Sequence, residues 1–301
     1  MKWLEISVDS PPEFVEPLSH IFSRYGHGGV AIEESGGLNP DEDEVPPSTP
    51  NHLRITTYLP MDSTTRSRRG GIEVGVALVS HLWPISPLHE RIVEEDWEQA
   101  WKRHFHVLHV GKCIVVVPTW REYVPSASDV VIWLDPGMAF GTGHHPTTRM
   151  CMVLLEEFCE PRMKVLDIGC GSGILSIVAA KLGVASVIGV DVDEVAVRSA
   201  VTNIAYNGMD KVVTVYHGIL ADMLIPSEEF ELVVANVSAT VVSGLADGIM
   251  ETLRPGSRLI ASGILANNQT SVSQSLESAG ATIERTMVDG DWVALVAVKS
   301  I

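Results

Sequence analysis

A glycine-rich turn between an apolar stretch and an amphipathic stretch is the most informative chemical feature of this 301-residue chain. Asp167 precedes three glycines at alternate positions, Gly169, Gly171 and Gly173, and Asp191 ends the next apolar run. Glycine lets a ligand press directly against the backbone, and it adopts at little cost the dihedral angles of a tight turn between strand and helix. A carboxylate at the end of the second strand can accept hydrogen bonds from both hydroxyls of a ribose. The spacing therefore predicts a nucleoside-binding site across two adjacent strand ends.

The number of residues between the glycines separates classes of cofactor. A dinucleotide-binding turn reads G-x-G-x-x-G and opens the N-terminus of a helix onto a pyrophosphate. Here Gly173 comes one residue earlier, which gives G-x-G-x-G. A nicotinamide-dependent oxidoreductase and a non-catalytic cofactor-binding module are alternatives, and a packing turn in another α/β protein would use the same glycines.

A second tract, upstream of the glycine turn, also favours ligand binding. Residues 134–148 read LDPGMAFGTGHHPTT, a density of glycine and proline that cannot form a regular element. The tract stands between an apolar strand and a helix that we expect to begin near Thr148, with Thr147 or Thr148 as the N-cap. Loops held between regular elements commonly carry binding residues. We therefore expect ligand contacts from this tract.

Composition and charge exclude several classes of function. A formal net charge of −17 opposes nonspecific binding to nucleic acid and favours a cationic partner, although acidity also serves solubility alone. The four cysteines form no C-x-x-C pair, and His104, His106 and His109 have no carboxylate or cysteine at ligand spacing, so we expect neither disulfides nor a metal site. The chain has no apolar run long enough to span a membrane and no signal-peptide pattern, which predicts a cytoplasmic protein.

The elements that must position these motifs fall into two groups along the chain. In residues 1–92, alternating and helical patterns predict strands and helices in the order β-α-β-β-α-β, which is a ferredoxin-like α+β domain. The expected strands are 2–8, 29–33, 52–59 and 89–93, and the expected helices are 12–25 and 71–82. Residues 93–106 place Trp97 and Trp101 on one helical face and predict a linker helix.

Residues 107–301 alternate between strand and helix and predict a doubly wound α/β domain. Strand-like runs at 113–118 and 130–134 open this domain, and two consecutive runs, 282–288 and 292–298, close it. The closing pair must be antiparallel, because a parallel crossover needs a dozen or more residues.

These motifs together resemble the PrmA family of ribosomal-protein methyltransferases, a branch of the class I S-adenosylmethionine-dependent enzymes. The resemblance spans nearly the whole chain. It rests on the 134–148 tract, on D-I-G-C-G-S-G at 167–173, on G-V-D-V-D at 189–193, on V-V-A-N at 233–236 and on S-G-I-L at 262–265. It implies a Rossmann-like, seven-stranded methyltransferase domain behind the smaller N-terminal domain, which would recognise the substrate.

The resemblance also implies S-adenosyl-L-methionine as the cofactor and assigns its contacts residue by residue. The matching positions are Phe140, Thr148, Asp167, Gly169, Gly171, Asp191 and Asn236. Asn236 would also be catalytic, because its side-chain carbonyl can orient the acceptor amine. The alternative is a structural asparagine that caps the end of a strand. The chain departs from the family after Asn236, where Val237-Ser238-Ala239 replaces the more frequent Ile-Leu-Ala.

The implied reaction is methyl transfer to the N-terminal α-amine and lysine ε-amines of large-subunit ribosomal protein eleven. That basic substrate suits an acidic enzyme, and we expect a monomer with no direct contact to nucleic acid or membrane. A methyltransferase for another protein lysine, or for a small molecule, would share every cofactor residue and is the nearest alternative.

Overall fold

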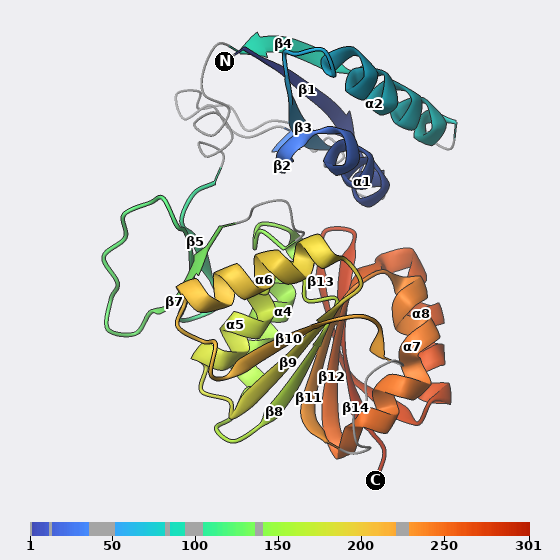
Figure 1. Ribbon diagram of the computed structural model, residues 1–301. Helices are drawn as coiled ribbons and strands as arrows, with labels where there is room; N and C mark the ends of the chain where they lie inside the picture. The colour runs from blue at the N-terminus through green and yellow to red at the C-terminus, as the bar shows by residue number, and fades with distance from the viewer. Residues whose placement is uncertain are drawn as a thin grey trace, which may run out of the picture. The chain divides into compact units, whose positions relative to one another are not determined.

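A computed structural model of the protein describes residues 2–11, 14–35, 52–81, 85–93, 105–135, 141–220 and 229–301. The chain divides into two compact units, Met1–His106 and Val107–Ile301, and each contains its own sheet (Figure 1). Most of the linker helix expected at 93–106 lies outside the described residues. No helix in the described part of the chain is long and apolar enough to cross a membrane.

The first unit has the β-α-β-β-α-β order of a ferredoxin-like domain. Its elements are β1 (Trp3–Ser10), α1 (Val15–Tyr25), β2 (His27–Ser35), β3 (His52–Pro60), α2 (Thr65–Ser80) and β4 (His89–Val93). The strands form one antiparallel sheet in the order β2-β3-β1-β4, with the two strands of the split β-α-β unit separated by β3. Apolar side chains of the strands and both helices, among them Ile6, Leu18, Phe22, Ile55 and Ile72, form its core.

Helix α2 corrects the expected range of 71–82, because it begins at Thr65. Gly71, the expected first residue, lies inside the helix and allows α1 to approach. A Cβ atom on Gly71 would lie 2.5 Å from Cε1 of Tyr25. Glycine at this position therefore serves helix packing.

The second unit is a doubly wound α/β domain. Its large sheet and covering helices are β8 (Lys164–Ile168), α5 (Ile174–Lys181), β9 (Ser186–Asp191), α6 (Glu194–Tyr206), β10 (Val213–His217), β11 (Phe230–Asn236), α7 (Ala239–Thr252), β12 (Leu253–Leu265), η3 (Ala266–Asn268), α8 (Gln269–Ser278), β13 (Ala281–Asp289) and β14 (Trp292–Lys299). The seven strands run in the order β10-β9-β8-β11-β12-β14-β13, and β14 is antiparallel to both its neighbours, as expected for the closing pair. The strand order reverses between β8 and β11, which is the point where ligands bind in open α/β sheets.

A small sheet and one helix precede the large sheet. The sheet contains β5 (Leu108–Val110), β6 (Ile114–Pro118) and β7 (Val130–Leu134), and α4 (Pro146–Phe158) follows it. The N-cap of α4 is His145, so the expectation that Thr147 or Thr148 caps this helix is wrong. Pro146 occupies the first helical position, where its missing N–H costs nothing, and both threonines therefore fall in the first turn, where they are buried.

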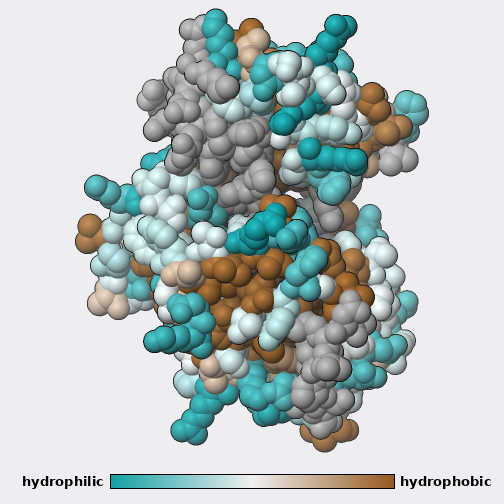
Figure 2. Space-filling view, viewed as in Figure 1, coloured by the Kyte–Doolittle hydropathy of each residue, from teal (hydrophilic) through white to brown (hydrophobic). Residues whose placement is uncertain are grey.

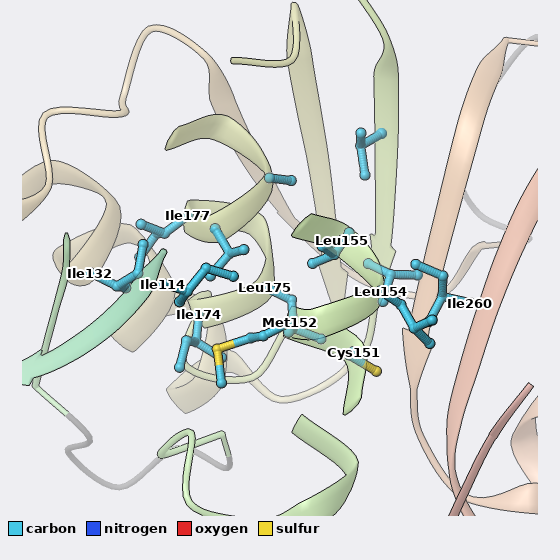
Figure 3. Close-up of a cluster of buried hydrophobic side chains, with 14 of the residues drawn as sticks. Ile114, Ile132, Cys151, Met152, Leu154, Leu155, Ile174, Leu175, Ile177 and Ile260 are labelled. Atoms are coloured by element: carbon cyan, nitrogen blue, oxygen red, sulfur yellow. The ribbon is translucent and has the colours of Figure 1, made fainter. Parts of the chain in front are cut away.

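Two large apolar clusters fill the second unit, one on each face of the large sheet, and a smaller one lies on the small sheet. Helices α4, α5 and α6 cover one face, and α7 and α8 cover the other (Figure 1). Figure 3 shows Ile114 and Ile132 of the small sheet beside Ile174 and Ile177 of α5, with Met152 of α4 extending toward Ile174. The first cluster thus joins the small sheet to the large one. Figure 2 shows hydrophobic atoms gathered in the middle of one face of this unit, with hydrophilic residues around them.

Candidate cofactor site

The glycine turn that joins β8 to α5 is tied to the end of β9 by backbone hydrogen bonds. The N–H groups of Gly169 and Cys170 both donate to the carbonyl of Val190, at 2.8 and 3.1 Å. Gly169, Gly171 and Gly173 have φ angles of 71°, 55° and 81°, a region that other residues rarely adopt. The sequence prediction of a strand, a tight turn and a helix therefore matches the local backbone.

Two of the glycines also allow close approach of other elements. A Cβ atom on Gly169 would lie 2.4 Å from Cγ1 of Val237, the residue that follows Asn236. One on Gly173 would lie 3.1 Å from the Cα of Ala200 on α6. The turn is therefore held between the end of β11 and one face of α6.

Asp191 lies at the end of β9 with its carboxylate against the glycine turn. Its Oδ2 accepts the backbone N–H of Gly171 at 2.8 Å, and its Oδ1 accepts that of Asp193 at 2.9 Å. These bonds fix the carboxylate while leaving each oxygen with further lone pairs. The side chain is only partly buried, so the remaining lone pairs can accept hydrogen bonds from the hydroxyls of a ribose.

Asp167, on β8, is fully buried, with no solvent-exposed surface. Its Oδ2 accepts the hydroxyl of Ser176 at 2.6 Å, whereas its Oδ1 has no hydrogen-bond partner. Burial raises the pKa of this carboxyl to about 7, and the negative charge of Asp191 adds to the rise. An unpartnered buried acceptor is costly, so this oxygen indicates a ligand that donates a hydrogen bond or carries positive charge.

Asn236 ends β11 beside the turn. Its Nδ2 donates to the hydroxyl of Thr148 in α4 at 3.2 Å, and its Oδ1 is buried with no hydrogen-bond partner. In the sheet, Val234 of β11 lies opposite Asp167, so the two unpartnered oxygens come from neighbouring strands at the switch point. This arrangement places two hydrogen-bond acceptors where the sequence predicted the ligand.

The structure gathers six of the seven predicted contact residues around the carboxyl ends of β8, β9 and β11. Thr148, Asp167, Gly169, Gly171, Asp191 and Asn236 are linked through the strand pairings and contacts given above. The remaining one, Phe140, lies outside the described residues. The sequence reading missed Ser176, because a serine inside a helical pattern carries no signal of the carboxylate that it contacts.

The chemistry of the site suits a cation better than a phosphate. Four backbone N–H groups of the turn, at residues 169, 170, 171 and 173, already donate within the protein. A pyrophosphate site needs such groups to point at the ligand. The buried groups left with open capacity, on Asp167 and Asn236, are acceptors. These residues fit a nucleoside with a cationic tail, as S-adenosylmethionine is, and they fit a nicotinamide dinucleotide poorly.

Among the described residues, no group of three or more His, Cys, Asp or Glu side chains could hold a metal ion. The four cysteines are free.

Comparison with known proteins gives a consistent result over the full length of the chain. The family model described as ribosomal protein L11 methyltransferase (PrmA) matches residues 2–300. The ribosomal protein L11 methyltransferase of Chloroflexus aurantiacus is 42% identical over 98% of this chain and 97% of its own length. That of Herpetosiphon aurantiacus is 36% identical over 100% of both chains.

A solved structure agrees with the sequence relatives. The crystal structure of ribosomal protein L11 methylase from Lactobacillus delbrueckii subsp. bulgaricus superposes with a TM-score of 0.61 and 32% identity, over 65% of this chain and 100% of that one. The glycine turn, the two strand-end carboxylates and Asn236 thus lie in a methyltransferase of known type, and the chain belongs to the PrmA family of ribosomal protein L11 methyltransferases.

Proposed function

We propose that this protein transfers methyl groups from S-adenosyl-L-methionine to the N-terminal α-amine and to lysine ε-amines of ribosomal protein L11. The observation that carries the proposal is the pair of buried, unpartnered acceptors, Asp167 Oδ1 and Asn236 Oδ1, beside a turn in which four N–H groups already donate within the protein. The names of the relatives supply the substrate. We propose a cytoplasmic location as well, because the proposed substrate is a ribosomal protein.

Each residue of the site has a role toward the cofactor, which when bound supplies a methyl group on a positively charged sulfonium. Asp191 accepts hydrogen bonds from the ribose hydroxyls. It uses the carboxylate lone pairs that are not engaged by the N–H groups of Gly171 and Asp193. Oδ1 of Asp167 accepts a hydrogen bond from the ammonium group at the methionine end of the cofactor. Gly169 must be glycine because Val237 fills the space that a Cβ would need, and this close packing keeps Asn236 beside the turn that faces the ligand.

Asn236 acts on the acceptor amine. Its Nδ2 is held by Thr148, which fixes the plane of the amide and leaves Oδ1 to accept a hydrogen from the amine. The amine is then oriented with its lone pair directed at the methyl group. Methyl transfer of this kind needs little covalent help, so positioning supplies much of the acceleration.

The two kinds of amine differ in the cost of losing a proton. A free α-amine has a pKa of about 7.7–8.0, so deprotonation at pH 7 costs roughly 1 kcal/mol, whereas a lysine near 10.4 costs about 4–5 kcal/mol. We therefore expect the α-amine to be methylated at a lower pH than the lysines. Burial around Asn236 lowers the pKa of an amine that enters the site and reduces this cost.

The first unit is the proposed substrate-recognition domain, with residues 1–92 as its folded part, 93–106 as the linker and 107–301 as the transferase domain. The cofactor residues all lie in the second unit, Val107–Ile301, and each unit has an apolar core of its own. We expect residues 107–301, produced alone, to bind the cofactor and to leave ribosomal protein L11 unmethylated. Methylation of that protein by the fragment at the rate of the full chain would contradict the assignment. The enzyme is proposed to act as a monomer without direct nucleic-acid contact.

The deciding experiment is incubation of the purified protein with ribosomal protein L11 and isotopically labelled S-adenosylmethionine, followed by mass spectrometry of the product. We expect label on the N-terminal amine and on lysines, and no label with the Asp191→Ala variant. Cofactor binding without label on ribosomal protein L11 would overturn the substrate while leaving the cofactor assignment intact. Titration with a nicotinamide dinucleotide is the matched negative control.

A further inference from the structure

The buried side chain of Asn203 on α6 makes three hydrogen bonds that no role in the cofactor site yet explains. Its Oδ1 accepts the backbone N–H of Asp135 at 3.0 Å. Its Nδ2 donates to the carbonyl of Asp135 at 3.0 Å and to that of Ser172 at 2.9 Å. The side chain is only 1% exposed, and these bonds use both its donors and its acceptor. Asn203 therefore joins residue 135, which follows β7, to the glycine turn.

Ser172 joins Gly141, which lies shortly before α4, to the same turn. It stands between Gly171 and Gly173, is fully buried, and donates its hydroxyl to the carbonyl of Gly141 at 2.6 Å. The chain is thus held at Asp135 and again at Gly141, and both attachments converge on Ser172. The preceding glycine of the turn donates to the carboxylate of Asp191.

We infer that Asn203 and Ser172 are positioning residues of the cofactor site, which hold the ends of the 135–141 stretch in register with the glycine turn and so with Asp191. Neither residue needs to touch the ligand for this role. The inference rests on the proposed function, because it concerns the affinity of that site for its cofactor.

The geometry of α6 supports a role directed at the turn. Gly173 packs against Ala200, which lies one helical turn before Asn203. A Cβ atom on Gly173 would lie 3.1 Å from the Cα of Ala200. The buried face of α6 therefore meets the turn twice, once through van der Waals contact and once through the amide of Asn203. A displacement of that amide would take its donor from the carbonyl of fully buried Ser172, and an unpaired buried group is costly.

Asn207, the C-cap residue of α6, provides a matched control. It is 8% exposed, accepts the backbone N–H of Trp133 at 3.0 Å, and donates to the carbonyls of Trp133 and Asn203 at 2.6 and 2.8 Å. It thus makes as many hydrogen bonds as Asn203, and two of them are to Trp133 of β7. It has no bond to the glycine turn among those given for its side chain. If both asparagines were purely structural, replacing either one would change the Kd for the cofactor to the same extent.

The test compares Asn203→Ala with Asn207→Ala in the full chain. Both variants are expected to lower the Tm of the ligand-free protein by several degrees, because each loses a buried set of hydrogen bonds. Of these two variants, only Asn203→Ala should raise the Kd for S-adenosylmethionine, as measured by isothermal titration calorimetry. The expected increase is about tenfold, which is the equivalent of roughly one buried hydrogen bond. Ser172→Ala should raise the Kd in the same direction, and the double variant should raise it by less than the product of the two single effects.

An unchanged Kd in Asn203→Ala, or equal increases in Asn203→Ala and Asn207→Ala, would overturn the inference and leave the proposed function standing. Failure of the unaltered protein to bind S-adenosylmethionine would instead overturn the cofactor assignment and this inference with it. If Asn203→Ala does not fold, Ser172→Ala decides, since it removes one hydroxyl from the network, and an unchanged Kd in that variant would contradict the role.

Discussion

The amide of Asn236 donates to the hydroxyl of Thr148 across 3.2 Å, which joins the end of β11 to the first turn of α4. This bond decides which way the amide faces, because it assigns Nδ2 to Thr148 and leaves Oδ1 as the atom available to a ligand. Asn236 can hold an amine by its carbonyl oxygen only in this orientation. Thr148 therefore controls the chemistry of Asn236 as well as lying among the predicted cofactor contacts.

The first prediction concerns this bond. Thr148→Val keeps the shape of the side chain and removes the acceptor, which leaves Nδ2 of Asn236 unpaired at a cost of about 1–3 kcal/mol. We expect the kcat for methyl transfer to fall about tenfold or more, in line with roughly 1.4 kcal/mol of lost positioning. Steady-state assays with labelled cofactor measure the change. Thr148→Ser retains the hydroxyl and should retain most of the activity, and equal losses in the two variants would contradict the proposed role of the bond.

A second prediction distinguishes the effect of Asp191 on cofactor affinity from the effect of Asp193 on stability. Asp191→Ala removes the acceptor for two ribose hydroxyls and also the bond to Gly171, so the Kd for S-adenosylmethionine should rise about a hundredfold, equivalent to roughly 3 kcal/mol. Asp193 is the N-cap of α6 and accepts the N–H of Val195 at 2.8 Å. Asp193→Ala should therefore cost about 1 kcal/mol of stability while leaving cofactor affinity nearly unchanged. Calorimetry measures the Kd of both variants, and thermal unfolding measures their stability. Equal Kd values for Asp191→Ala and Asp193→Ala would show that Asp191 does not bind the cofactor.

The sequence predicted the glycine turn and the strand-end carboxylates because local rules determine them. A tight turn requires glycine where φ is positive, and an apolar run that ends in aspartate places the carboxylate at the sheet edge whatever the rest of the fold does. The closing hairpin was predictable for the same reason, since the three residues between 288 and 292 are too few for a parallel crossover.

The bonds that hold the site together were not predictable, because they depend on tertiary packing. Ser176 reaches Asp167 only because α5 packs with that side chain toward β8, and Asn203 reaches residue 135 across 68 positions of the chain. The start of α2 was misplaced because a glycine that allows helix packing looks in sequence like a helix break. The N-cap of α4 was misassigned because threonine is the commoner cap, whereas the proline at 146 makes His145 the last extended residue.

A third prediction follows from the buried carboxyl of Asp167, whose pKa is raised to about 7. In the unfolded chain the pKa of this group is about 3.9, so between pH 4 and 7 the folded protein binds the proton more tightly than the unfolded chain does. Its contribution to the free energy of unfolding therefore falls as the pH rises through that window. Asp167→Asn removes this titration, and we expect the variant to gain stability relative to the unaltered protein as the pH increases from about 4 to about 8.

The same substitution should weaken cofactor binding, because a cationic ligand favours the ionised carboxylate. For the unaltered protein, the affinity for S-adenosylmethionine should rise as the pH increases from about 6 to about 8, and Asp167→Asn should abolish most of this dependence. Calorimetric titration across that range measures it. Parallel pH profiles for the two proteins would show that Asp167 does not carry the charge that the ligand meets.

The last prediction uses two glycines with nearly the same backbone conformation. Gly169 has a φ of +71° and Gly208 a φ of +68°, so alanine at either position carries the cost of a left-handed conformation, about 1–2 kcal/mol. The surroundings differ, since nothing lies within 4 Å of a Cβ on Gly208 whereas one on Gly169 would lie 2.4 Å from Cγ1 of Val237.

Relief of that contact must displace Val237, and with it the neighbouring Asn236. We therefore expect both alanine variants to lower the Tm, but only Gly169→Ala to abolish measurable binding of S-adenosylmethionine and methyl transfer. Thermal unfolding with and without the cofactor distinguishes the two effects, because the cofactor should raise the Tm of Gly208→Ala and leave that of Gly169→Ala unchanged. A normal cofactor-induced shift in Gly169→Ala would mean that Val237 can move without disturbing Asn236, and that the close approach at Gly169 is a packing feature alone.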